Sequence, residues 1–410
     1  MSFTSFNALS ELQDEFHREL ESIVNWWLEY SVDAEHGGFY GEVDSNNQPQ
    51  KNATKGIILN ARILWFFSEV AARYHLQKNP KAHECSSIAK RAYDYILRCF
   101  FDEEHGGFYW ELDAQGNPVN SKKQVYAQAF VIYALTAYYN LTQENQVLTH
   151  ALDCFHLVES KTRDPQFGGY LEAFTREWGT LDDLRLSDKD LNFPKSQNTH
   201  LHILEAYTQL NKIHSHPAIT AALRYNIELF DKHIIDKQTY HLRMFMDLNW
   251  VDHSPGYTYG HDIEASWLIA QALDSLNDEA YGKSLMPHLL KIAEVTLAEG
   301  IGDSGQVLDS YDFATHEKRC DAVWWVQAEA LVGFLFAYGE LGDAKFLKAA
   351  EDCWAFIKKF QIDRKHGEWL WLATVNTQPP IANYKLGFWK CPYHNGRAMM
   401  EAINYLSKLN

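Results

Sequence analysis

The sequence predicts an all-α fold, an (α/α)6 barrel of six helical hairpins with short β-hairpins on one rim. Two observations carry this prediction: a short glycine-containing phrase recurs six times, and each recurrence leads into apolar or amphipathic stretches of helical length. The equivalent positions are taken as Gly37, Gly106, Gly168, Lys237, Ser304 and Gly367. The steps between them are 69, 62, 69, 67 and 63 residues. A near-constant period indicates one architecture, so we expect a single barrel domain over residues 1–410, although the length alone would suggest two or three domains.

Two segments in each period have the length and apolar spacing of helices. In chain order they are residues 9–30, 60–74, 87–101, 126–140, 146–160, 199–213, 217–233, 261–276, 282–299, 324–341, 344–360 and 394–406. Residues 9–30 are amphipathic. Residues 60–74 are apolar on most faces, and helices of that kind lie inside a protein. One inner and one outer helix per period make six hairpins, and this number favours a closed ring over the alternative of an open solenoid.

The glycine phrases lie between the helical segments and have the character of turns. The clearest is His36-Gly37-Gly38-Phe39-Tyr40, which recurs at residues 105–109. Glycine supplies the positive φ that tight hairpin turns require. We therefore expect these phrases to form the short hairpins on the rim, and we expect His36 and His105 to be structural.

Composition excludes several classes of function. The formal charge is −17, which argues against nucleic acid, because binding there depends on cationic side chains. A neutral substrate fits this charge better than a polyanion does. Aromatic residues are frequent, with 13 Trp, 22 Tyr and 23 Phe. Many of these must fill the core, but aromatic rings also stack on the apolar faces of sugars.

The remaining bulk features point to a cytoplasmic protein with no membrane partner. Residues 1–16 do not resemble a signal peptide, and the longest apolar run is too short to span a bilayer. The cysteines form no CxxC pair. We interpret all six as buried thiols of a reducing compartment, not as a disulfide framework or zinc site.

Chemically capable residues occupy a similar place in each repeat, near the start of the inner helix. They are Arg62, Tyr126, Asn198 with His202, His261 with Glu264, Trp325 and His394. Six inner helices that start at one end of a barrel would bring these side chains into one ring at the mouth of the central cavity.

The histidines of this ring carry most of the functional signal. His202 and His261 each have a glutamate three residues later, on the same helical face, where a carboxylate would raise the basicity of the imidazole. His394 stands at a helix N-terminus, where the dipole favours the neutral imidazole. Each histidine alone could be a hydrogen-bonded core residue, and a three-histidine zinc site stays open as an alternative. HExxH, P-loop, GxGxxG and GxSxG motifs are absent.

The chain resembles the N-acylglucosamine 2-epimerase superfamily, and more closely the cellobiose 2-epimerases, a branch that includes the mannobiose 2-epimerases. The resemblance runs nearly end to end. It rests on segments 36–39, 56–65 (GIILNARILW), 125–128, 185–190, 198–202, 260–267, 324–331 and 388–397. It implies an (α/α)6 barrel that inverts C2 of the reducing-end sugar of a disaccharide, converting glucose to mannose and back.

The resemblance also implies roles for individual residues. His261 and His394 would be the acid/base pair at C2, His202 would assist ring opening and proton relay, and Arg62 would hold the enediolate oxygen. The sugar-binding residues would be Tyr126, Asp190, Asn198, Glu264, Trp325 and Trp389. The chemistry agrees, because an enediolate needs a nearby cation and a base that titrates near neutrality. No group or electron leaves, so we expect no cofactor and no metal, and we expect a monomer.

Three other functions remain open on the sequence. An aldose–ketose isomerase would use the same enediolate chemistry. A glycoside hydrolase of the same fold would need two carboxylates, for which Asp190 and Glu264 are candidates. A sugar-binding or protein-interaction module would use the barrel without turnover.

Overall fold

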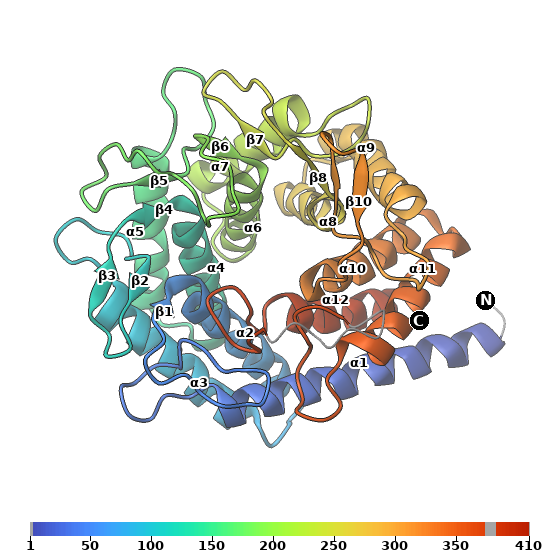
Figure 1. Ribbon diagram of the computed structural model, residues 1–410, viewed down its shortest axis with the longest axis horizontal. Helices are drawn as coiled ribbons and strands as arrows, with labels where there is room; N and C mark the ends of the chain where they lie inside the picture. The colour runs from blue at the N-terminus through green and yellow to red at the C-terminus, as the bar shows by residue number, and fades with distance from the viewer. Residues whose placement is uncertain (1–2, 374–382, 410) are drawn as a thin grey trace.

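The computed structural model describes residues 3–373 and 383–409, and twelve α-helices in them form two concentric rings (Figure 1). The inner ring consists of α2 (Ile57–Leu76), α4 (Val125–Thr142), α6 (Gln197–Ile213), α8 (Tyr259–Leu276), α10 (Trp324–Leu341) and α12 (His394–Leu409). The outer ring consists of α1 (Phe3–Tyr30), α3 (Ala82–Tyr95), α5 (Asn145–Lys161), α7 (Pro217–Leu229), α9 (Glu279–Glu299) and α11 (Ala344–Phe356). The inner helices are buried on nearly all faces, and four of them, α2, α4, α8 and α10, have the apolar sequences expected of such helices, whereas α6 and α12 carry more polar residues. The predicted (α/α)6 barrel is confirmed.

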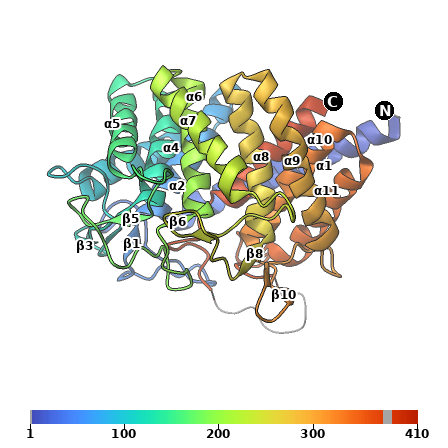
Figure 2. The ribbon, with the colours of Figure 1, turned by 90° about the horizontal axis from the view of Figure 1, so that it is seen from above.

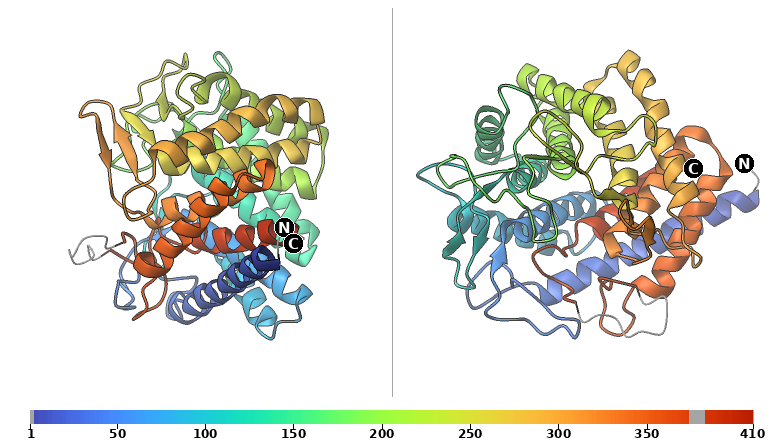
Figure 3. Two further views of the ribbon diagram at one scale, coloured as in Figure 1. Left: turned by 90° about the vertical axis from the view of Figure 1, so that its right-hand side faces the viewer. Right: turned by 45° about the horizontal axis from the view of Figure 1, so that its top comes forward.

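The ring is closed where the two ends of the chain meet. Helix α12 lies beside α2, with Nη1 of Arg73 donating to Oδ1 of Asn404 at 3.0 Å. Gly396 of α12 lies against the ring of Phe66, and an added Cβ would come within 2.3 Å of it. Helix α1 packs on the outside of α12, so the sixth hairpin joins the first helix to the last (Figure 3). The alternative of an open solenoid is wrong.

The short strands all lie at one end of the barrel (Figure 2). Two three-stranded sheets contain β1 (Lys55–Gly56), β2 (Glu111–Leu112) and β3 (Pro118–Asn120), and β8 (Gly256–Thr258), β9 (Ser310–Asp312) and β10 (Glu317–Arg319). Two pairs are β4 (Lys123–Gln124) with β5 (Ala173–Phe174), and β6 (Lys195–Ser196) with β7 (Phe245–Met246). Pairs such as β1–β2 and β4–β5 are antiparallel and join neighbouring repeats. Strand pairing on the rim therefore connects neighbouring repeats, in addition to the turns within each repeat.

The glycine phrases themselves close by one bridge each, and these bridges correct the alignment of two repeats. In the first repeat Val32 pairs with Phe39, and Gly37 two residues earlier has φ 85°. In the fourth repeat Ile235 pairs with Leu242, so the equivalent residue is Tyr240 (φ 63°), three residues beyond the predicted Lys237. In the fifth repeat it is Gly305, one residue beyond the predicted Ser304. The backbone turn is conserved between repeats where the amino acids are not.

The fourth residue of four inner helices holds the turn on the rim. These residues are Gln128, His200, Asp262 and Gln327. Each accepts a backbone N–H from the turn; Oε1 of Gln128, for example, accepts from Phe108 at 2.9 Å. Buried lysines paired with aspartates support the turns of four repeats, the first, second, third and sixth: Lys55–Asp33, Lys123–Asp102, Lys195–Asp164 and Lys385–Asp363. The fourth residue of these inner helices therefore has a structural role on the rim.

The cysteine interpretation holds only in part. All six cysteines are free. Cys320, however, is exposed and Cys99 is partly exposed, so the prediction that all six are buried is wrong for these two. Within the described residues, no helix has the length and apolar character needed to cross a membrane.

Candidate active site

The second and sixth residues of the inner helices turn toward the barrel axis. Tyr126 and Asn198 are second residues, and Arg62, His202 and Glu264 are sixth residues. Positions two and six differ by one helical turn and share a face, whereas position four faces the rim. This register explains why scaffold and site residues alternate along one helix.

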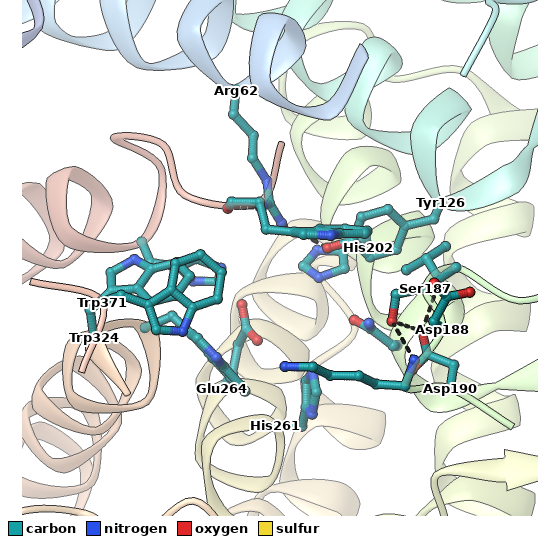
Figure 4. Close-up of a pocket in the computed structure, with 16 residues that line it drawn as sticks. Arg62, Tyr126, Ser187, Asp188, Asp190, His202, His261, Glu264, Trp324 and Trp371 are labelled. Atoms are coloured by element: carbon teal, nitrogen blue, oxygen red, sulfur yellow. Dashed lines mark hydrogen bonds between the residues drawn. The ribbon is translucent and has the colours of Figure 1, made fainter. Parts of the chain in front are cut away.

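These side chains surround a cavity of about 360 Å³ at the strand-bearing end of the barrel (Figure 4). The structure brings all ten predicted site residues to this cavity: Arg62, Tyr126, Asp190, Asn198, His202, His261, Glu264, Trp325, Trp389 and His394. Six further lining residues were not predicted: Leu186, Ser187, Asp188, Lys189, Trp324 and Trp371. The volume lies within the range of small-molecule sites. The catalytic and binding roles of the ten residues stay predictions.

His394 begins helix α12, as predicted, and is oriented by a carboxylate. Its Nδ1 lies 2.6 Å from Oε1 of Glu329 on α10. Arg397 donates to that same oxygen at 2.8 Å. Because this oxygen already accepts from Arg397, it acts as an acceptor toward the imidazole, so Nδ1 carries the proton and Nε2 is free as a base. Burial, with Arg62 and Arg397 nearby, holds the pKa of His394 well below its usual value.

His202 also has a carboxylate partner, and this is the one predicted from its spacing. Its Nδ1 lies 3.1 Å from Oε2 of Glu205, one turn later on α6. Burial opposes ionisation of Glu205, but Arg397 and His202 lower its pKa to about 2. The imidazole packs edge-on against Tyr126, with ring centroids 4.8 Å apart. His202 is therefore held by an ionised carboxylate on one side and an aromatic ring on the other.

His261 departs from the prediction. Its Nδ1 lies 2.6 Å from the hydroxyl of Thr258, and the expected pairing with Glu264 does not form. Oε1 of Glu264 instead accepts from Arg397, while Oε2 has no partner among the described residues. Burial lowers the pKa of His261 to about 3. The ring of Trp325 lies 4.7 Å from that of His261 and 5.6 Å from that of His394, between the two histidines.

Beneath the cavity, a buried arginine on one inner helix contacts carboxylates from three other inner helices. Arg397 of α12 contacts the carboxylates of Glu205, Glu264 and Glu329, and each of these four side chains is at least 95% buried. Burial raises the pKa of Glu329 well above its usual value; Arg397 opposes that rise and Glu264 adds to it. A positive charge on the neighbouring His394 would favour the ionised form of Glu329. Of this network, only Glu264 was among the predicted site residues. The available signal was Glu329, which stands at position six of α10 as Glu264 does on α8.

Arg62 is held as a fixed cation at the opposite wall. Its Nη2 donates to the hydroxyl of Tyr126 at 2.7 Å, and its Nη1 donates to the carbonyl of Trp389 at 3.4 Å. The guanidinium carbon lies 4.2 Å from the centre of the Phe130 ring and 4.5 Å from that of Tyr393. A cation fixed over two rings with few carboxylate contacts remains available to an anionic oxygen in the cavity.

Aromatic rings and a loop form the outer walls of the cavity. Trp324 and Trp371 lie together with ring centroids 4.3 Å apart. The loop that contains Asp190 follows β5, and the Asp190 carboxylate accepts from both the backbone and the hydroxyl of Ser187 at 2.8 Å (Figure 4). Asp190 therefore shapes its own loop at the edge of the cavity.

One cluster has the composition of a metal site. A ligand atom from each of Glu264, Glu329 and His394 lies within 4.8 Å of the others. Arg397 donates to both carboxylates, however, and places a positive charge directly beside them. The donor set is therefore occupied by a guanidinium, which makes this cluster a poor host for a cation.

The comparisons with known proteins agree with the fold. The family model of the N-acylglucosamine 2-epimerases matches residues 38–397. The chain is 41% identical over 393 residues to a cellobiose 2-epimerase of Bacteroides fragilis, covering 96% of this chain and 98% of that protein. It is 38% identical over 398 residues to that of Dictyoglomus turgidum, covering 96% and 99%. The structure of cellobiose 2-epimerase from Bacillus thermoamylovorans gives a TM-score of 0.90 at 36% identity, covering 96% and 99% of the two chains.

The fold and the family match together define a class, the carbohydrate epimerases. The chain belongs to the N-acylglucosamine 2-epimerase family, and its near full-length relatives place it in the cellobiose 2-epimerase branch.

Two more distant structures share only the fold. A D-mannose isomerase gives a TM-score of 0.81 at 20% identity, covering 98% of this chain and all of that one. A family 76 mannosidase of Bacteroides thetaiotaomicron gives 0.64 at 11% identity, covering 97% and 99%. The isomerase and hydrolase alternatives therefore receive support for architecture and none for chemistry.

Proposed function

We propose that this protein reversibly epimerises C2 of the reducing-end glucose or mannose unit of β-1,4-linked disaccharides, with cellobiose and mannobiose as the first candidates and lactose as a further one. The observation that carries the proposal is the presence of His261 and His394 on different helices around one cavity, with Arg62 in the same cavity. Epimerisation needs a base on one face of C2 and an acid on the other, and two histidines from different helices can meet that demand.

The reaction follows from the acidity of the open-chain sugar. Ring opening, assisted by His202, exposes the C1 aldehyde and makes the C2 proton removable. One histidine in its neutral form takes this proton, and the electron pair of the C–H bond enters an enediolate whose oxygen is stabilised by Arg62. The other histidine, in its protonated form, returns a proton to the opposite face. Burial favours the neutral imidazoles, so the protonated form depends on nearby negative charge.

The remaining polar and aromatic lining suits a disaccharide. Tyr126, Asn198 and Glu264 lie beside the histidines and can bond the hydroxyls of the reducing unit. Oδ1 of Asn198 and Oε2 of Glu264 are buried atoms without partners among the described residues, so each can accept from a sugar hydroxyl. Trp325 and Trp389 offer apolar faces for sugar rings. Asp190 can bond the sugar from its loop at the edge of the cavity.

The test is to follow cellobiose and mannobiose by NMR with the enzyme in heavy water. Epimerisation predicts deuterium at C2 and a product in which the reducing unit has the opposite configuration. Free glucose would instead indicate hydrolysis, and a ketose would indicate that the proton returns to C1. In His261→Ala and His394→Ala, epimerisation should fall to near background with the fold intact by circular dichroism, and each variant should lose C2 exchange in the epimer whose proton the missing histidine takes. Full exchange in both variants would contradict the assignment of these histidines.

We further propose that the protein acts as a cytoplasmic monomer of one domain without cofactor or metal. Its six free cysteines support a reducing compartment. The chemistry moves only protons, so chelator treatment should leave the rate unchanged. Light scattering should give the mass of one 47.4 kDa chain. A dimer mass, or loss of activity with chelator, would contradict the corresponding part of this proposal.

A further inference from the structure

The two histidines of the proposed acid/base pair are oriented by partners of different chemistry. Nδ1 of His394 bonds a carboxylate oxygen of Glu329, whereas Nδ1 of His261 bonds the hydroxyl of Thr258. Both contacts measure 2.6 Å. Glu329 is almost fully buried and is tied to Arg397, while Thr258 is half-buried and ends strand β8 directly before helix α8. The two histidines therefore have hydrogen bonds of equal length, but only the partner of His394 is a carboxyl group that can carry charge.

We infer that Glu329 and Thr258 are positioning residues of unlike kind: Glu329 aligns His394 and stabilises its protonated form, whereas Thr258 aligns His261 without supplying charge. The inference rests on the proposed function and deepens it. A carboxylate next to an imidazole stabilises the imidazolium. A hydroxyl can donate or accept, so it holds either tautomer of the ring but offers no compensating charge.

Proton transfer then has a different environment at each face of C2. As one C2–H bond breaks, its electron pair enters the enediolate and the proton binds Nε2 of one histidine. As the new bond forms, the enediolate carbon takes a proton from Nε2 of the other. The total number of protons on the pair is unchanged, and positive charge moves from one imidazole to the other. At His394 this charge is next to Glu329, and at His261 it is next to a neutral hydroxyl.

The inference predicts opposite exchange patterns in two variants. Glu329→Gln impairs proton transfer by His394 and leaves that by His261 intact. The enediolate formed by His261 then returns to the starting sugar, which acquires deuterium from heavy water without changing configuration. We expect epimerisation to fall about 100-fold, the lower end of what a positioned acid or base contributes to proton transfer. Exchange should persist in only one of the two epimers.

Thr258→Val should impair proton transfer by His261 and leave that by His394 intact. Exchange should then persist in the other epimer, with epimerisation lowered about 10-fold, and Thr258→Ser should restore both because it keeps the hydroxyl. A purely structural loss would lower exchange in both epimers together. Matched controls are Glu294→Gln on α9, whose carboxylate contacts only the exposed lysines Lys291 and Lys345, and Thr149→Val on the exposed face of α5.

The experiment measures deuterium at C2 of the recovered starting sugar and of the product, with cellobiose and with its 2-epimer as separate substrates. Opposite retained epimers in the two variants support the inference. The same retained epimer in both, or equal loss from both, overturns it. If Glu329→Gln does not fold, Thr258→Val decides alone, since unselective exchange in that variant contradicts the inference. Absence of exchange in the unmodified protein is a different result and refutes the proposed function itself.

Discussion

The indole ring of Trp325 lies against Gly260, so closely that a Cβ on residue 260 would come within 2.6 Å of the ring. Gly260 precedes His261 on α8, and Trp325 is the second residue of α10. The absence of a side chain at residue 260 therefore sets how near Trp325 can approach the histidines.

Gly260→Ala should displace Trp325 and disturb the site more than the fold. We expect kcat/KM to fall at least about 10-fold, because displacements of an ångström in a catalytic site have effects of that order or larger. Overpacking should cost about 1–3 kcal/mol of stability. The measurement is steady-state kinetics with thermal unfolding.

The matched control for this change is Gly282→Ala on helix α9, where an added Cβ meets nothing within 4 Å. It should raise stability by about 0.5–1 kcal/mol and leave activity unchanged. An active Gly260→Ala variant with the kinetics of the unmodified protein would show that Trp325 does not depend on this contact.

His200 should be replaceable by the glutamine that other repeats use at the same position. Its Nε2 accepts from the backbone of Tyr170 at 3.1 Å, as Oε1 of Gln128 accepts from Phe108 at 2.9 Å. His200→Gln should cost less than about 1.5 kcal/mol, whereas His200→Ala leaves a buried N–H and a cavity and should cost about 2–4 kcal/mol. Denaturant unfolding at pH 7 compares the two, and equal losses would contradict the proposed equivalence.

The same residue should make the fold sensitive to acid. Burial lowers the pKa of His200 to about 4 in the folded protein, against about 6.5 in an unfolded chain. Below the unfolded value the unfolded chain binds more protons, so the free energy of unfolding falls as pH drops from about 6.5 toward 4. His200→Gln removes this contribution, and its stability should decline less between pH 7 and pH 5. An unchanged decline would assign the acid sensitivity to other groups.

Activity should persist into mildly acidic solution. Burial lowers the pKa of His261 to about 3 and that of His394 well below its usual value. A solvated histidine base would lose half its activity near pH 6.5. We expect the acid limb of kcat/KM to lie below that pH, measured where circular dichroism shows the fold intact. A limb at 6.5 would indicate that a base in the free enzyme is solvated.

Removing Arg397 should destabilise the whole barrel. Arg397→Met leaves the carboxylates of Glu205, Glu264 and Glu329 buried together without their cation, and loss of one partner from such a network costs about 3–5 kcal/mol. Arg397→Lys should restore little, because an ammonium cannot reproduce the planar fork. Arg224→Met, which removes a partly exposed pair with Asp278, should cost less than about 1 kcal/mol. Similar losses in both methionine variants would contradict this account.

Much of the site was predictable because its residues occupy equivalent positions in successive repeats. Arg62, His202 and Glu264 occupy the sixth position of their helices, and a common start for the inner helices places common positions in one ring. The prediction failed at His261. His261 and Glu264 do share a helical face, but Arg397 of α12 takes the glutamate and Thr258 takes the histidine.

The sequence by itself determined the period, the two classes of helix and the side chains at the mouth of the barrel, because these depend on local spacing and apolar pattern. The tertiary structure decided which residue orients His394 and which cation takes the carboxylate of Glu264. Glu329 and His394 are 65 residues apart in the chain, and their contact exists only because α10 and α12 pack together as successive inner helices. Hydrogen bonds of this kind depend on positions in space, which the spacing within one helix does not contain.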